Sequence, residues 1–437
     1  MARKRREIAL LDSCLAAPLA PAAPRSVAEA IDTKFKLAAA LRAERAMQSW
    51  PVTETAHPTI AHWQSGAFKF TFGYQRADLT ICGPPIYPAL ASRITPAHTI
   101  YTGAGMSAIA SVLTAALRVR GGASVFLPRG AYSETRELLE RFGDHVLIET
   151  WGHAPRRGRR AISILWIDSC VPSGFSDFKA MPTGDFDLVV LDTTCFSHGS
   201  RRIVQVVDWA QAVHLPIALV RSHAKLDCLG VEYGRLGSID YLWDERERRH
   251  SWMKRLLAET REAIRLFGTA ALPSHFPPFA GDPAYHVCTA QRTAAILRNT
   301  RRAARRLARA CGKDAVGTYQ HNLYLTLAPA VRRNAAAVWR TADELCHLLS
   351  QQALPVKHAG SFGFDFTALD CFDDPISARP VLRIATGDLP TGTVDRIVDA
   401  IAEYWGSHES ADGVDSPRSR ASPRTTVASA AASRAPG

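Results

Sequence analysis

Short apolar runs alternate with amphipathic stretches through the middle of the chain. Four of these runs are rich in aliphatic and β-branched residues, which is typical of buried parallel strands. They are residues 123–127, 162–167, 188–191 and 217–220. Between them, residues 132–142 and 203–214 carry apolar side chains at helical spacing. Strand, helix and strand in this rhythm predict an α/β fold with a mostly parallel sheet and right-handed crossovers.

The pattern changes from about residue 285 onward. A long Arg- and Ala-rich helix is predicted first, and shorter strands and helices follow it. The predicted strands are residues 323–327 and 381–385, and the predicted helices are residues 334–350 and 394–405. This mixture predicts a second, smaller α+β domain.

Composition divides the chain into five segments. Residues 1–30 are basic and then Ala- and Pro-rich, so we expect a loose arm. Residues 408–437 are dominated by Ser, Ala, Pro, Arg and Gly without apolar periodicity, so we expect a disordered tail. Between these ends we expect an N-terminal segment (31–75), a large domain (76–280) and a small C-terminal domain (281–407).

The overall composition is that of a globular protein. Of the 437 residues, 47% are hydrophobic and 22% are charged, which excludes wholesale disorder and a disulfide scaffold. No apolar run approaches the roughly 18 residues that span a bilayer. Glu7 and Asp12 interrupt the apolar stretch behind the basic start, which disfavours a signal peptide. The nine cysteines are scattered without a CxxC pair, so we expect reduced thiols, a cytoplasmic protein and no metal site.

The net charge of +12, from 53 basic and 41 acidic residues, raises the question of a nucleic-acid partner. Part of it lies in a strip of arginines from Arg298 to Arg309, spaced along a predicted helix among Ala and Leu. A solvated helix face explains this strip more simply than a binding surface does, because no nucleic-acid fold signature accompanies it. We therefore expect neither nucleic acid nor a membrane as a partner.

Two polar features lie where the predicted strands end, which is where open α/β sheets bind ligands. The run Thr102-Gly-Ala-Gly105-Met106 precedes a predicted helix, and backbone N–H groups at a helix start are suited to bind an anion. Asp192 ends an apolar strand, where a buried carboxylate needs a cation or a hydrogen-bond donor. Taken alone, a turn before a helix and a capping Asp explain both features equally well.

Two basic residues add to this set. Lys225 follows Ser222 just after a predicted buried strand, where desolvation and nearby positive charge make a lysine amine nucleophilic. Arg383 alternates with apolar neighbours on a short strand, and its planar guanidinium is suited to bind a carboxylate. Each residue by itself is also compatible with an ordinary surface position.

Taken in chain order, these features resemble the fold type I enzymes that depend on pyridoxal 5'-phosphate (PLP), the aspartate aminotransferase superfamily. The details are most similar to its cystathionine γ-synthase/γ-lyase branch of Cys/Met metabolism. The resemblance extends over about residues 70–405. The matching residues are Tyr74, Arg76, Gly105, Met106, Tyr132, Asp192, Ser222, Lys225, Ser361 and Arg383.

The resemblance implies a role for each matching residue. Lys225 would carry the cofactor and move a proton, Asp192 would pair with the pyridine nitrogen, and Tyr132 would stack on the ring. Arg383 and Ser361 would bind the substrate carboxylate. The residues implied in phosphate binding are Thr102, Gly105, Met106 and Ser222, with Tyr74 and Arg76 reaching across the interface of a homodimer or tetramer.

The sequence departs from this branch at two places. After the lysine it has Leu226-Asp-Cys-Leu-Gly-Val-Glu-Tyr-Gly-Arg235, which is more similar to aminotransferases, where an arginine at this distance also binds phosphate. An Asn-containing motif of the branch is replaced by Asp168-Ser-Cys-Val-Pro-Ser173-Gly, which leaves Ser173 as the substitute. The chain is therefore expected to be a divergent member.

The resemblance implies a PLP-dependent enzyme that acts on an L-amino acid bound to the cofactor. Elimination or replacement at the β or γ carbon, in a specialised bacterial pathway, is the favoured reaction because of the Tyr-x-Arg and Gly-Met motifs. Transamination is the alternative suggested by the region around Arg235, and retro-aldol cleavage or decarboxylation stays open. A non-catalytic regulator or nucleic-acid binder on the same fold is the remaining alternative.

Overall fold

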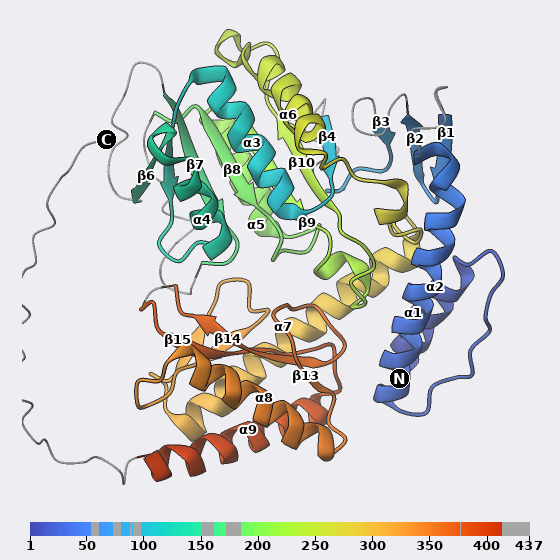
Figure 1. The fold of residues 1–437 in the computed structure, drawn as a ribbon, viewed down its shortest axis with the longest axis vertical. Coiled ribbons are helices and arrows are strands. Elements are labelled where there is room, and N and C mark those ends of the chain that lie inside the picture. The colour runs from blue at the N-terminus through green and yellow to red at the C-terminus, as the bar shows by residue number, and fades with distance from the viewer. Residues whose placement is uncertain are drawn as a thin grey trace, which may run out of the picture.

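The computed structural model describes residues 1–53, 61–72, 80–87, 90, 98–150, 161–171, 185–375 and 377–412. Figure 1 shows a large sheet with its helices, a smaller domain below it, and two N-terminal helices along one side. The fold class expected from the sequence, a large α/β domain followed by a smaller α+β domain, is confirmed.

The large domain is built on a seven-stranded sheet. Its strands, in spatial order, are β4 (His98–Thr102), β10 (Gly237–Leu242), β9 (Ile217–Ser222), β8 (Leu188–Asp192), β7 (Ile162–Asp168), β5 (Ala123–Leu127) and β6 (Val146–Thr150). The strands from β9 to β6 are parallel to one another, and β10 is antiparallel to both of its neighbours. The four predicted strands all lie in this parallel part, within two residues of the expected bounds.

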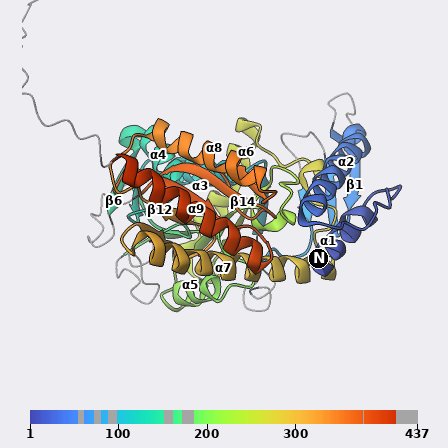
Figure 2. The ribbon, with the colours of Figure 1, turned by 90° about the horizontal axis from the view of Figure 1, so that it is seen from below.

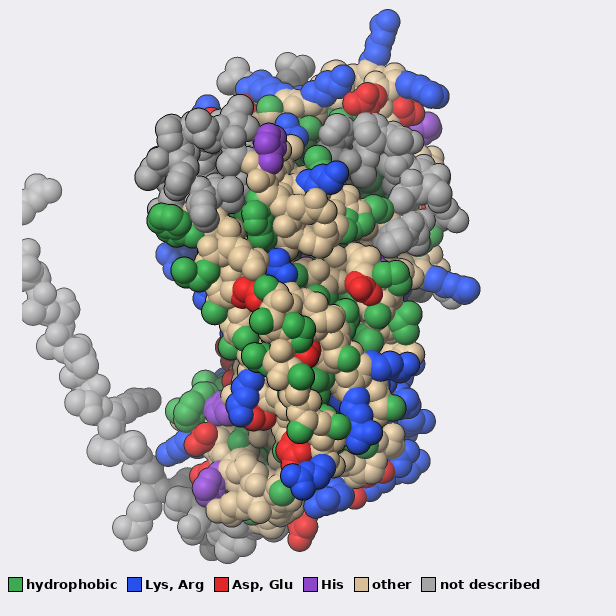
Figure 3. All heavy atoms as spheres, turned by 90° about the vertical axis from the view of Figure 1, so that its right-hand side faces the viewer, with side chains coloured by type: hydrophobic (Ala, Val, Ile, Leu, Met, Phe, Trp, Pro, Cys, Tyr) green, Lys and Arg blue, Asp and Glu red, His purple; other side chains and the backbone are tan. Residues whose placement is uncertain are grey.

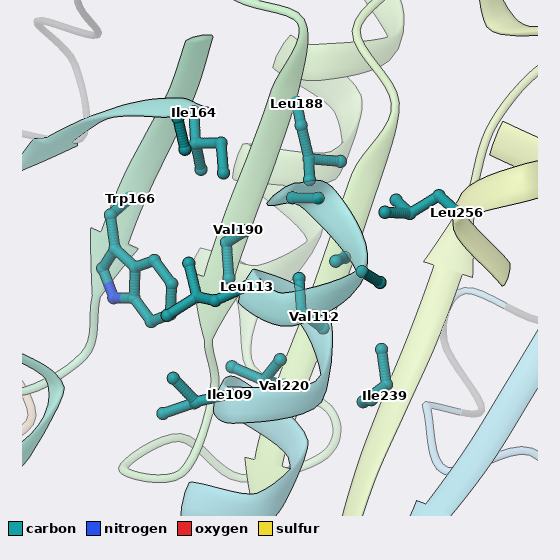
Figure 4. Packing of buried hydrophobic residues seen from close by; sticks show 14 of the residues in the cluster. Ile109, Val112, Leu113, Ile164, Trp166, Leu188, Val190, Val220, Ile239 and Leu256 are labelled. Carbon is teal, nitrogen blue, oxygen red and sulfur yellow. The ribbon is translucent and has the colours of Figure 1, made fainter. Parts of the chain in front are cut away.

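Helices cover both faces of this sheet, which explains why its central strands are apolar throughout. On β8, Leu188 and Val190 pack toward α3 (Gly105–Arg120), α4 (Ser133–Arg141) and α6 (Met253–Phe267). Val189 and Leu191 pack toward α5 (Arg201–Ala212) on the opposite face. Figure 4 shows the α3 side of this core, where α3 side chains contact residues from four neighbouring strands.

The small domain contains a five-stranded sheet and three helices. The strand order is β11 (Val316–Thr318), β12 (Leu325–Leu327), β15 (Pro380–Ala385), β14 (Thr367–Asp373) and β13 (Val356–His358). The helices are α7 (Pro283–Cys311), α8 (Ala335–Gln351) and α9 (Thr391–Asp412), and Figure 2 shows them packed on the sheet. One apolar cluster joins these helices to the strands.

The N-terminal region differs from its prediction. Instead of a loose arm, residues Ala2–Ser13 form helix α1, which packs against α2 (Val27–Thr53). Lys4 and Glu7 of α1 are buried because they pair with charged residues far away in the chain. A small antiparallel sheet follows α2 and contains β1 (Ala61–Ser65), β2 (Phe68–Phe72) and β3 (Thr80–Cys82).

The basic strip lies on α7, where part of its charge is paired. Arg302 donates two hydrogen bonds to Asp395 of α9, and Arg306 donates to Asp399 one turn further along. Figure 3 shows Lys and Arg side chains gathered along one edge of the lower part of the molecule. Among the described residues, no helix is long and apolar enough to cross a membrane. The predicted disordered tail begins at residue 408, but residues 408–412 continue helix α9. The rest of the tail lies outside the described residues.

Candidate active site

Three polar side chains extend the α3-facing side of the sheet at the carboxyl ends of neighbouring strands. Asp168 ends β7, Asp192 ends β8 and Ser222 ends β9. Asp168 is aligned with Asp192 in the register of the sheet, and Asp192 is aligned with Val220. Side chains alternate between the two faces along a strand. Each of the three therefore lies on the same face as the residue two positions before it, which packs on α3. The sheet therefore directs them toward one place.

A cavity of about 460 Å³ lies at this edge of the sheet. Eight residues singled out from the sequence line it, and they come from both domains. They are Gly105, Met106, Tyr132, Asp192, Ser222, Lys225, Arg235 and Arg383. The tertiary structure thus brings together residues that are up to 278 positions apart, from Gly105 to Arg383.

Helix α3 begins at this cavity with Gly105. A Cβ atom on Gly105 would lie only 2.7 Å from Cβ of Ser222 and 3.1 Å from its Cα. Glycine is therefore required for the helix to approach β9 this closely. The first backbone N–H groups of a helix have no partner within the helix, so α3 presents donors and the positive end of its dipole to the cavity.

Asp192 and Asp168 form a buried carboxylate pair. Burial, together with the neighbouring Asp192, raises the pKa of Asp168 to about 7. Burial also raises the pKa of Asp192, while hydrogen bonds from Thr194 oppose this shift. The pair favours a proton or a cationic group beside it, because two adjacent buried carboxylates ionise together only at high cost.

Lys225 lies just beyond β9 and is held by the small domain. Its Nζ donates a hydrogen bond of 2.7 Å to Oγ of Ser361 and lies 5.9 Å from the ring centroid of Phe362. Gly363 approaches the backbone of Lys225, since a Cβ at Gly363 would lie 2.8 Å from the Lys225 carbonyl oxygen. The loop that carries Ser361 therefore fixes the position of the lysine amine.

Arg383 reaches the cavity from the middle of β15. Its Nη2 donates a hydrogen bond of 3.0 Å to Asp370 on β14, and the side chain is nearly buried. The rings of Tyr324 and Phe372 lie 5.6 and 5.3 Å from the guanidinium carbon. These contacts orient the group, and since a guanidinium has five N–H donors, Asp370 uses only part of its capacity.

Tyr132 is positioned by the same carboxylate pair. Its backbone N–H donates a hydrogen bond of 2.9 Å to Oδ2 of Asp168, just before α4 begins. Burial raises the pKa of the Tyr132 phenol far above its usual value, and the neighbouring Glu134 raises it further. The phenol therefore stays protonated and can act as a hydrogen-bond donor in the cavity.

Two other described residues named from the sequence, Thr102 and Ser361, are not among the residues that line the cavity. Thr102 does not line the cavity, because it is fully buried and its hydroxyl donates to the carbonyl oxygen of Ala104. Ser361 contacts Lys225 through its hydroxyl. Tyr74 and Arg76 lie outside the described residues, as does Ser173.

The sequence analysis missed the polar network that supports the lysine loop. Arg221 is fully buried and makes two 2.7 Å hydrogen bonds to Asp227. His223 contacts Asp227 through Nδ1 and Ser238 through Nε2, both at 2.8 Å. Burial alone would raise the pKa of Asp227, but Arg221 and His198 hold it well below its usual value. The available signal for this network in the sequence was Arg221, a basic residue directly after the apolar run 217–220.

Thr194 is a second residue that the sequence analysis missed. It lines the cavity, and its Oγ1 accepts a hydrogen bond of 3.0 Å from the backbone N–H of Ser222. Thr194 therefore ties the end of β8 to the end of β9. Its position two residues after Asp192 was the only sequence signal.

No known family model matches the chain, and no curated protein matches it in sequence. A cystathionine gamma synthase from Xanthomonas oryzae pv. oryzae, solved with cystathionine, superposes with a TM-score of 0.51 at 15% identity, covering 88% of this chain and 100% of that one. A cystathionine gamma lyase (CalE6) from Micromonospora echinospora gives a TM-score of 0.47 at 15% identity, over 72% and 85% of the two chains. An alanine aminotransferase from Pyrococcus furiosus gives 0.43 at 10% identity, over 71% and 76%. The chain therefore has the fold of the Xanthomonas cystathionine gamma synthase, which is the fold that its motifs resemble.

Proposed function

We propose that the protein binds PLP and acts on an L-amino acid by elimination or replacement at the β or γ carbon. The observation that carries this proposal is the single cavity shared by the amine of Lys225, the carboxylate of Asp192 and the start of α3. A lysine amine, a buried carboxylate and an anion-binding helix start are three groups that this cofactor needs together. They come from different elements and meet only in the folded chain.

The start of α3 fits a phosphate group. The close approach of Gly105 to Ser222 places the first backbone N–H groups of α3 beside the Ser222 side chain, so that both can contact one anion. Ser222 and Arg235 line the same cavity and supply a hydroxyl and a positive charge. These residues would hold the phosphate, and Met106 would pack beside it.

The carboxylate pair fits the ring nitrogen of the cofactor. Asp192 would hold a proton on that nitrogen, because a cation beside a buried carboxylate offsets the desolvation that raises the pKa of Asp192. When bound, PLP supplies the electron sink that stabilises negative charge at the substrate Cα. Tyr132 lines the cavity beside this pair and would pack on the ring.

Lys225 would carry the proton during the reaction. Its Nζ would attach the cofactor in the resting enzyme and, once released by substrate, would take a proton from Cα as a general base. The hydrogen bond to Ser361 gives this amine a fixed position in the cavity. Its partner belongs to the small domain, so the position of that domain would control the proton transfer.

Arg383 would bind the α-carboxylate of the substrate. Asp370, Tyr324 and Phe372 hold the guanidinium in one orientation, with N–H donors left for an incoming anion. A fixed carboxylate aligns the Cα–H bond with the base, which lowers the entropy cost of the proton transfer.

Two observations bear on the type of reaction. The fold neighbour solved with cystathionine is a gamma synthase, and the Gly105-Met106 motif belongs to that branch, so we favour elimination or replacement. Arg235 lines the cavity in a segment that is more similar to aminotransferases, which makes transamination the second candidate.

The first experiment is an absorbance spectrum of the purified protein with added PLP. We expect a yellow band that borohydride removes, and we expect the Lys225→Ala variant to lack it. Lys254→Ala is the matched control, because this lysine is exposed on α6, and it should retain the band. A colourless wild-type protein that PLP does not reconstitute would contradict the proposal.

The type of reaction is then determined from the products that the enzyme forms. L-amino acids that perturb the band are incubated with the protein, with and without a keto-acid acceptor. Ammonium and a keto acid formed without an acceptor would indicate elimination. Strict dependence on an acceptor would indicate transamination and would reject the favoured reaction while retaining the cofactor.

A further inference from the structure

Two cysteines contact each other at the edge of the proposed active site. Cys170 follows β7 and Cys195 follows β8, and their Sγ atoms are 3.4 Å apart. Both side chains line the cavity that contains Lys225. Cys170 is partly exposed, whereas Cys195 is only 3% exposed. An oxidant that enters the cavity therefore meets Cys170 first and finds a second thiol directly behind it.

Backbone hydrogen bonds hold the two thiols in this position. The N–H of Cys170 donates to Oδ1 of Asp168 at 2.7 Å. The N–H of Cys195 donates to Oγ of Ser169 at 3.2 Å, which links the two loops directly. The contact between the sulfurs is therefore built into the ends of two neighbouring strands, and preorganisation of this kind favours an intramolecular reaction.

The protonation state of His321 shows whether the two cysteines are better suited to form a disulfide or to bind a metal ion. One of its ring nitrogens lies within 4.8 Å of both sulfurs. Its Nδ1 accepts a 2.8 Å hydrogen bond from the backbone N–H of Leu323, so the ring proton must be on Nε2, which is buried and has no hydrogen-bond partner among the described residues. Burial lowers the pKa of His321 to about 3, so the ring stays neutral.

This tautomer disfavours metal binding. Coordination through Nε2 would require its proton to move to Nδ1, which would break the hydrogen bond from Leu323 and place two donors against each other. The neutral ring beside the two sulfurs, with its N–H on Nε2, is instead suited to stabilise negative charge on a sulfur atom. We propose that Cys170 and Cys195 are a reversible modification site, which hydrogen peroxide oxidises to a disulfide within the cavity.

The proposed reaction has two balanced steps. The Cys170 thiol attacks one peroxide oxygen, the O–O bond breaks, and a sulfenic acid and one water form. The Cys195 sulfur then attacks the Cys170 sulfur, the S–O bond breaks, and the disulfide and a second water form. Together, two thiols lose two electrons and two protons to one peroxide. The sulfurs must approach from 3.4 Å to about 2.05 Å, which requires rotation of the side chains.

The disulfide would connect the loops that follow Asp168 and Asp192. It would narrow the cavity at the place where these carboxylates lie, and a thiol reductant would reverse it. The thiol pair depends on the geometry of the two loops alone and does not require the proposed cofactor. The hydrogen bond between the two thiols is the largest cause that raises the pKa of Cys170, and burial is the second. The thiol is therefore protonated at neutral pH, and because the thiolate is the reactive form, oxidation should accelerate as the pH rises.

The test is peptide mapping of the full chain after treatment with hydrogen peroxide. Trypsin places Cys170 in peptide 161–179 and Cys195 in the adjacent peptide 180–201, with no other cysteine in either. After alkylation under denaturing conditions, we expect loss of two of the nine free thiols and a cross-linked pair of these two peptides. Dithiothreitol should restore both thiols.

Variants separate this pair from general cysteine oxidation. Cys371→Ser is the matched control, because Cys371 is also partly exposed, and the cross-link should form in it as in wild type. In Cys195→Ser the cross-link should be absent, and dimedone should trap a sulfenic acid on Cys170.

Three results would overturn the proposal. The first is sulfinic acid on Cys170 of the wild-type protein without a cross-link. The second is cross-linking of Cys170 to a different cysteine. The third is a tightly bound metal that must be chelated before either thiol reacts, which would assign the pair to a metal site. The wild-type mapping decides among these outcomes even if a variant fails to fold.

Discussion

The close approach of α3 to β9 depends on one missing side chain. Gly105 has backbone dihedral angles that other residues can adopt, since its φ lies outside the left-handed region, but its Cβ would lie 2.7 Å from Cβ of Ser222. The requirement for glycine is thus one of space. The absence of a Cβ atom at Gly105 keeps the start of the helix within reach of a phosphate bound beside Ser222.

We expect Gly105→Ala to weaken PLP binding. Overpacking of this kind costs about 1–3 kcal/mol, and a loss of that size at the phosphate site would raise the Kd for PLP roughly 5- to 160-fold. Gly103→Ala is the matched control, because its Cβ would meet only carbonyl oxygens at 3.6 and 3.9 Å. The two affinities are measured by titrating each variant with PLP and following absorbance. Equal affinities would show that the close approach does not shape the phosphate site.

At the scale of elements, helix α1 is attached to the protein by a buried cluster of charges. Glu7 of α1 and Lys34 of α2 pair with each other, and Lys34 also pairs with Asp365, which follows the loop carrying Ser361 and Gly363. Arg292 of α7 donates to Glu7 and to Asp365. Lys4 of α1 completes the contact with Asp365. The cluster thus connects the N-terminal helices to the loop that positions Lys225.

We expect Lys34→Ala to destabilise the protein strongly. Its side chain is fully buried, and burial lowers the pKa of Lys34 while Asp365 and Glu7 oppose that shift. Removing one partner from a buried ion pair costs about 3–5 kcal/mol, because it leaves uncompensated charge in the interior.

The control for this prediction is Lys36, which lies two residues after Lys34 on α2. Lys36 on the same helix forms an exposed pair with Asp32, and such pairs contribute roughly 0–1 kcal/mol. The free energy of unfolding of Lys34→Ala and Lys36→Ala is measured by urea denaturation. Similar losses in the two variants would mean that the cluster adds little to the attachment of α1.

At the scale of the whole molecule, the cavity is shared between two domains and is expected to be shared between two subunits. Lys225 and Asp192 belong to the large domain, and Ser361 and Arg383 belong to the small one. Tyr74 and Arg76 are predicted to reach the phosphate across a subunit interface. That assembly stays a prediction, because one chain is described and both residues lie outside its described part.

We expect mixed subunits to restore activity that separate variants lack. Arg76→Ala would remove a phosphate contact, and Lys225→Ala would remove the amine that attaches the cofactor. A hybrid dimer has one site with both residues intact, provided that Arg76 comes from the other subunit. The two variants are unfolded together, refolded and assayed. Activity no greater than the sum of the separate variants would argue that each site is built within one chain.

Local patterns were sufficient for four of the five strands in the parallel part of the sheet, all except β6. Residues 188–191 read as a buried strand because both faces of β8 are covered by helices, so every position is apolar. Asp192 stood out because it interrupts that run at its carboxyl end. The same reasoning failed for β10, since Ser238 and Asp240 make it look polar. Their partners, His223 and Thr99, are brought alongside only by the fold.

The sequence by itself determined the α/β class and the order of the main strands and helices, because these features depend on periodicity and on strand ends, which neighbouring residues encode. It also singled out eight residues that line the cavity, several of them only through the resemblance of their motifs. Only the tertiary structure decided that the charged N-terminus is a packed helix with two buried charges and that Cys170 and Cys195 touch. The physical reason is that a buried charge or a thiol pair depends on partners far away in the chain. Lys4, for example, pairs with Asp365, 361 positions later.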